Sequence, residues 1–158
     1  MTEKLESGEM WKFLFYGAVG GFISGIVFSV VIFMGGLFPW IGQLLGFADP
    51  MDFLIGVIMY FIFSIIVGLI YGVIILFLKY INWDISNWVK NIILGLIYGL
   101  IVWILDALIG MQILMDLVGM TTVNNPLLIL RSPFGLVGYL IFGAIIAAVA
   151  WFLNERMK

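Results

Sequence analysis

Residues 53–78 read FLIGVIMYFIFSIIVGLIYGVIILFL, a run without a single charged residue. About 20 consecutive apolar residues let a helix cross the hydrocarbon core of a bilayer, which is roughly 30 Å thick. We therefore expect this run to be a membrane-spanning helix. Stretches of the same character occur before and after it, and the four predicted spans are residues 11–38, 53–78, 88–108 and 133–153.

The composition of the whole chain also indicates a membrane protein. Of its 158 residues, 65% are hydrophobic and only 10% are charged, whereas soluble domains carry about 25% charged residues. So few charges cannot solvate a water-exposed surface, which excludes a soluble enzyme, a disordered chain and a nucleic-acid-binding domain. The length allows a single domain over residues 1–158. The predicted fold class is all-α, an integral membrane four-helix bundle.

The stretch between the third and fourth predicted spans is interrupted by polar residues. Residues 109–132 contain Asp116, Asn124, Asn125 and Pro126, so their apolar runs are too short to cross a bilayer. We predict an outer connection with short interfacial helices here instead of a fifth span.

The basic residues near the predicted span ends predict the orientation. Lysine and arginine are enriched in cytoplasmic loops, and here only Arg131 lies on the side of the first and third connections. The other six lie on the opposite side, which predicts a cell (plasma) membrane protein with both termini in the cytoplasm. These six are Lys4, Lys12, Lys79, Lys90, Arg156 and Lys158.

The sequence contains no cysteine and no histidine. Thiol nucleophiles are therefore excluded, and so are metal sites built from these two residues. No cluster of nucleophile, base and metal ligands is apparent, so we expect a protein that is not an enzyme and holds neither metal nor cofactor. The net charge of −2 indicates no nucleic-acid partner. The expected partners are the lipid bilayer and other membrane subunits or further copies of the chain.

A five-residue motif occurs twice. Gly-Leu-Ile-Tyr-Gly fills residues 68–72 of the second span and residues 95–99 of the third. At 1.5 Å per helical residue, both copies lie at nearly the same depth in the cytoplasmic half of the bilayer. The hydroxyls of Tyr71 and Tyr98 need partners at that depth, and we expect a hydrogen bond between spans.

Every predicted span carries small residues four positions apart on its cytoplasmic half. Such residues let membrane helices approach closely, and this generic packing role is favoured over a dedicated functional motif. Because the outer halves are bulkier, we expect a bundle that is tight on the cytoplasmic side and looser outside. The predicted packing residues are Gly17, Gly21, Gly25, Gly68, Tyr71, Gly72, Gly95, Tyr98, Gly99, Gly143 and Ala147.

Asp106 is the carboxylate expected to lie within the apolar slab, near its outer edge. An ionisable group there is a functional hypothesis by default. One interpretation is a cation or proton site in an outer vestibule formed by Asp106, Asp116, Gln112 and Tyr60. The other is a structural ion pair between Asp106 and Arg131, which is favoured because no second carboxylate lies deep in the membrane. Asp49 and Asp52 are interpreted as residues that start the second span.

The chain resembles small, glycine-striped four-span prokaryotic membrane proteins of the uncharacterised, YagU-like type. The resemblance rests on Gly17–Gly25, Asp49-Pro50-Met51-Asp52, the two Gly-Leu-Ile-Tyr-Gly motifs and Gly138–Gly143. It implies the architecture and no site residues. The chain departs from small multidrug transporters, which rely on a glutamate in the middle of the first span.

These observations predict a non-enzymatic polytopic membrane protein. Our preferred hypothesis is a packing or accessory subunit of a membrane complex or homo-oligomer, because four spans offer more small-residue faces than one small bundle must bury. The alternative is a small cation- or proton-linked channel or transporter with an outer acidic vestibule.

Overall fold

The computed structural model describes residues 7–83, 87–106 and 130–156, and these contain helices and no strand. The helices are α1 (Ser7–Met34), α2 (Leu37–Leu44), α3 (Met51–Tyr80), α4 (Trp88–Trp103) and α6 (Pro133–Arg156). Four helical stretches are long and apolar enough to cross a membrane: Gly8–Met34, Met51–Tyr80, Trp88–Asp106 and Pro133–Arg156. The predicted all-α bundle of four spanning helices is thereby confirmed.

The first helix ends earlier than the sequence suggested, and a second short helix follows it. α1 stops at Met34 because Gly36 adopts a left-handed conformation with φ 64°, which a residue without a side chain adopts readily. The first span was predicted to extend to residue 38, and α2 was not predicted. Gly35 and Gly36 did not predict the end of the helix, because glycine is also common inside membrane helices.

Asp52 starts α3 as predicted, and it also fastens α2 to that helix. Its carboxylate accepts hydrogen bonds from the Phe53 backbone N–H at 2.6 Å and from Gln43 Nε2 at 2.8 Å. Asp49 is exposed, and its side chain makes no cap to α3. The buried Asp52 carboxylate is therefore fully used in building the α2–α3 corner.

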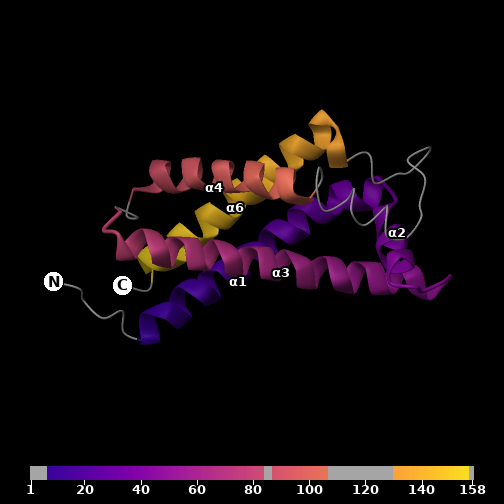
Figure 1. Cartoon of the computed structure of the whole chain (residues 1–158), viewed down its shortest axis with the longest axis horizontal. Helices are drawn as coiled ribbons and strands as arrows, with labels where there is room; N and C mark the ends of the chain where they lie inside the picture. The colour runs from indigo at the N-terminus through magenta and orange to yellow at the C-terminus, as the bar shows by residue number, and fades with distance from the viewer. Residues whose placement is uncertain (1–6, 84–86, 107–129, 157–158) are drawn as a thin grey trace.

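The helices pack in the order α3, α1, α6, α4. α1 and α6 cross the view diagonally, with α4 above and α3 below (Figure 1). The start of α1 and the end of α6 lie at one end of the bundle and α2 at the other. We call these the termini end and the α2 end. α3 and α4, which carry the repeated motif, approach each other much less closely than α3 approaches α1 and α4 approaches α6.

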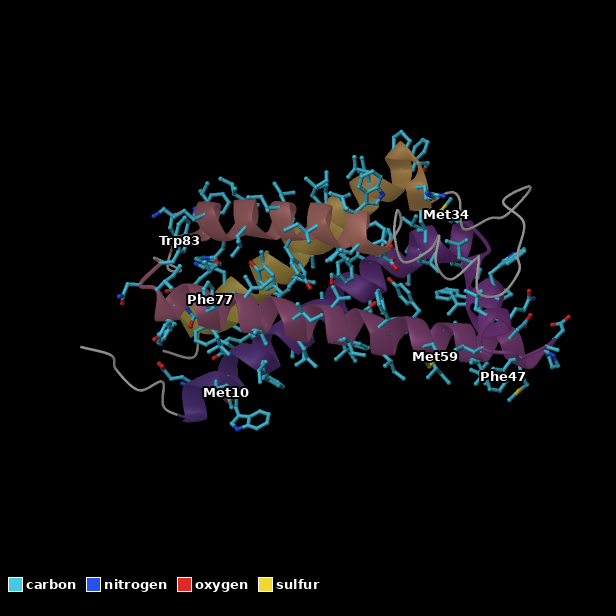
Figure 2. The ribbon with its side chains drawn as sticks, in the orientation of Figure 1. Met10, Met34, Phe47, Met59, Phe77 and Trp83 are labelled. Carbon is cyan, nitrogen blue, oxygen red and sulfur yellow. The ribbon has the colours of Figure 1, made fainter. Side chains whose placement is uncertain are left out.

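The outer surface of the bundle is apolar. Labelled side chains such as Met10, Phe77 and Met59 project from the outside of the helices (Figure 2). Met34 is 82% exposed and Phe134 is 78% exposed. A surface of this kind is stable against lipid and costly in water, so the chain is a multi-pass membrane protein.

Candidate functional site

The repeated motif of α3 packs against the glycine stripe of α1. A Cβ added to Gly17 would collide with the carbonyl oxygen of Gly68 and lie 2.9 Å from the backbone nitrogen of Gly72. One added to Gly21 would lie 2.9 Å from the Cα atom of Gly68. Real Cβ atoms essentially never come so close to another atom. The two backbones therefore touch where neither helix has room for a side chain.

The second copy of the motif packs against α6 in the same manner. A Cβ on Gly95 would collide with the carbonyl oxygen of Gly143 and with the Ala147 side chain, while one on Gly99 would collide with the Tyr139 carbonyl. The predicted packing glycines are thus all buried in contacts inside the chain. Each copy faces a different partner helix, so the two copies do not pack on each other.

Tyrosine side chains bridge the wider space between α3 and α4. Tyr98 Oη donates a hydrogen bond to the Val67 carbonyl oxygen at 2.5 Å, and the rings of Tyr71 and Tyr98 are 5.1 Å apart. The Tyr71 hydroxyl is buried and has no hydrogen-bond partner within the described part of the chain. The expected hydrogen bond between spans is therefore made by one tyrosine of the pair.

This asymmetry predicts opposite effects for two matched substitutions. Tyr98→Phe removes the hydrogen bond to the Val67 carbonyl and should destabilise the protein by about 1 kcal/mol. Tyr71→Phe removes a hydroxyl without a partner among the described residues, so its effect on stability should be neutral or favourable. Thermal unfolding of the two variants in one mild detergent measures both effects. Equal losses of stability would contradict the hydrogen-bond assignment.

A cavity of about 300 Å³ lies between the helices on the α2 side of these glycine contacts. All five helices contribute to its wall, with Leu37 and Ile41 from α2 and Phe28 from α1. Close glycine contacts also occur beside the cavity, where Gly42 of α2 meets Asp52 and Gly56 of α3 meets Phe38, so the contrast between a tight half and a looser half stays a prediction. The described residues of the lining are almost entirely apolar, while Asp116 and Gln112 of the predicted vestibule lie outside the described part of the chain.

Asp106 supplies the charged group of this cavity. It lies in a π-helical turn, residues 104–106, that continues α4, and such turns are frequent at functional sites. Tyr139 Oη of α6 donates a hydrogen bond to Asp106 Oδ2, and both residues line the cavity. Asp106 Oδ1 accepts no hydrogen bond from the described residues. Among the described residues, Tyr139 is therefore the hydrogen-bond partner of this carboxylate.

Two further polar side chains on the cavity wall are satisfied within the bundle. Tyr60 Oη donates to the Gly25 carbonyl oxygen at 2.9 Å, and Ser64 Oγ donates to the Tyr60 carbonyl oxygen at 3.0 Å. Tyr60 was predicted to share a site with Asp106, and the structure places both on the same cavity. Among the described residues there is no group of three that could hold a metal ion.

Tyr139 is the site residue that the sequence analysis missed. The partner expected for Asp106 was Arg131, but the hydrogen bond to this carboxylate comes from Tyr139 because the close α4–α6 contact brings the two side chains together. A tyrosine inside an apolar span needs a partner for its hydroxyl. This requirement could have identified Tyr139 from the sequence as a residue that pairs with a polar group such as Asp106. Arg131 is half-buried with an interaction of its own, and its pairing with Asp106 stays a prediction. Asp116 and Gln112 lie outside the described residues.

Comparisons with family models, with characterised proteins and with solved structures find no match to this chain. The function is therefore argued from the geometry of the cavity, and the YagU-like resemblance stays a prediction.

Proposed function

We propose that the protein is a small cation- or proton-linked membrane transporter in which Asp106 is the group that takes up the ion. The observation that carries this proposal is the position of Asp106, on the wall of a cavity within the bundle and with Oδ1 free of hydrogen bonds from the described residues. A carboxylate in a membrane span is costly, so its presence in a cavity supports a functional role.

The apolar wall of the cavity favours a carrier over an open channel. A channel needs polar groups or water along its path, because an ion that loses its hydration shell must be given replacement ligands. Phe28, Ile32, Leu37 and Phe142 line this cavity and cannot supply such ligands. Uptake at a single carboxylate followed by a change of conformation is consistent with such a wall.

The hypothesis of a packing or accessory subunit stays a prediction, and we do not prefer it here. It rested on small-residue stripes in excess of what one bundle must bury. In the structure, the glycines of those stripes are buried against other helices of the same chain. They therefore offer no face to a second subunit.

The remaining parts of the proposal follow the sequence analysis. We take the protein to be non-enzymatic and to lie in the cell membrane with both termini in the cytoplasm, as the distribution of lysine and arginine favours. The α2 end and the cavity beside it then face the outer half of the bilayer.

Asp106→Asn is the substitution that tests this proposal. In proteoliposomes that hold a pH gradient, Na⁺, K⁺ and small organic ammonium ions are added in turn, and the collapse of the gradient is followed with an internal pH dye. We expect at least one cation to collapse the gradient with the wild-type protein, and Asp106→Asn to lower the rate to that of protein-free liposomes. The reason is that the amide can neither carry a charge nor exchange a proton.

The matched control is Asp49→Asn, which removes the same charge from an exposed position at the α2 end. It should keep the wild-type rate. Thermal unfolding of both variants checks that each is folded. A full rate with Asp106→Asn, or no cation response with the wild-type protein, would rule out the proposed transport.

A further inference from the structure

The side chains that line the cavity indicate both the charge of the substrate and the shape and polarity of the rest of the molecule. Five aromatic side chains line it, from three different helices: Phe28, Tyr60, Phe63, Tyr139 and Phe142. Aromatic faces attract organic cations, and aromatic cages are the usual recognition device for quaternary ammonium groups. A hydrated metal ion would gain little from such a wall.

Asp106 adds a fixed partner for that charge. The hydrogen bond from Tyr139 is made to Oδ2, and within the described residues Oδ1 accepts none. Two unit charges attract each other more strongly in an apolar site than in water. A volume of about 300 Å³ is at the lower end of the range for small-molecule pockets. The cavity therefore suits one charged nitrogen with a compact apolar body.

The cavity also reaches the lipid-facing surface. Met59 and Phe63 line it, and they are 37% and 46% exposed on the spanning part of α3. The Met59 side chain projects from the outside of α3 (Figure 2). Among the described helices, α3 and α4 make little backbone contact beside the cavity. A molecule dissolved in the bilayer can approach the cavity at this point.

We propose that this cavity binds an apolar organic ammonium ion, which enters from the bilayer past Met59 and Phe63 and places its nitrogen beside Asp106. This inference rests on the proposed function, because it gives the same carboxylate its substrate class. The aromatic side chains surround the cation, and the apolar body replaces lipid contacts with contacts to Ile32, Leu37 and Phe142.

Binding is tested with benzyldimethylhexylammonium, whose nitrogen cannot lose its charge, on the protein in nanodiscs. The anion 4-hexylbenzenesulfonate is the matched probe of similar size. We expect saturable binding of the cation only, weakened about tenfold or more by Asp106→Asn, since the charge pair forms in apolar surroundings. Phe142→Leu keeps the wall apolar and should weaken binding less, by the loss of one aromatic face.

Equal binding of the cation and the anion, or unchanged cation binding to Asp106→Asn, would overturn the inference. The outcome is separable from that of the proposed function. If Asp106→Asn abolishes cation-driven proton movement while benzyldimethylhexylammonium fails to bind the wild-type protein, the transport proposal stands and the substrate class is wrong. If the probe binds through Asp106 and no cation drives proton movement, the transport proposal fails.

The path of access is tested by adding bulk on the lipid-facing side of the cavity. Met59→Trp adds it where Met59 lines the cavity, whereas Phe47→Trp adds it at the α2 end, at an exposed residue outside the cavity lining. The initial rate of binding of the radiolabelled cation should fall severalfold with Met59→Trp and stay unchanged with Phe47→Trp. An unchanged rate with Met59→Trp, or a fall with Phe47→Trp alone, would contradict entry past Met59.

Discussion

Replacing Gly68 with alanine is expected to cause one of the largest losses of stability in this protein. The new Cβ would collide with the Gly17 carbonyl oxygen and lie 2.7 Å from the Cα atom of Gly21. Both obstacles are backbone atoms, so no side-chain rotation can relieve the contact. α1 and α3 must move apart, and we expect a cost of about 1–3 kcal/mol, the usual range for overpacking.

The measurement is thermal unfolding in a mild detergent, compared with Gly8→Ala. Gly8 lies on the same two-helix unit, and an added Cβ there would meet no atom within 4 Å. The control substitution should therefore leave the unfolding temperature unchanged or raise it slightly, because alanine is the better helix former. If both variants unfold at the same temperature, the close approach of α1 and α3 is wrong.

Gly56→Ala is expected to combine a loss of stability with a loss of the cavity. Its Cβ would collide with the carbonyl oxygen of Phe38, so α2 would be pushed away from α3. Leu37 and Ile41 of α2 form part of the cavity wall and would move with the helix. We therefore expect the free energy of unfolding to fall by about 1–3 kcal/mol, which lowers the unfolding temperature. We also expect weaker binding of the ammonium probe.

Gly72→Ala is the matched control for this effect. Its Cβ would also meet a backbone carbonyl, that of Phe13 at 2.5 Å, but away from the residues that line the cavity. It should lower the unfolding temperature to a similar degree and keep the affinity for the probe in the fraction that remains folded. Equal losses of affinity in both variants would mean that α2 does not shape the site.

The spanning helices were predictable because their signal is physical and continuous. An uncharged run such as residues 53–78 has one stable conformation in a bilayer, since every backbone hydrogen bond must be made internally. The glycines at positions 68 and 95 were also identified, because small residues at intervals of four permit close packing. Their partners were not predictable, since the repeat itself does not say that its two copies face α1 and α6 separately.

The site was predictable only in part. Asp106 was apparent as a charge within an apolar stretch, and Tyr60 as a polar residue at a similar depth. The hydrogen bond from Tyr139 and the wall supplied by α2 depend on how the helices cross, which no local pattern encodes. α2 in particular was not predicted, because it continues the apolar run of α1 and the left-handed conformation of Gly36 cannot be inferred from composition.

The pairing of α1 with α3 and of α4 with α6 bears on the order of assembly. Each pair joins spans that follow one another along the chain, and the entropic cost of closing a connection rises only slowly with its length. We therefore expect each glycine-packed pair to form early, the first of them once Tyr80 has entered the bilayer. The contact between α1 and α6 joins the two ends of the sequence, with the Phe28 ring 5.1 Å from that of Tyr139. It must form last, and because it closes one wall of the cavity, an incomplete chain has no binding site to occupy.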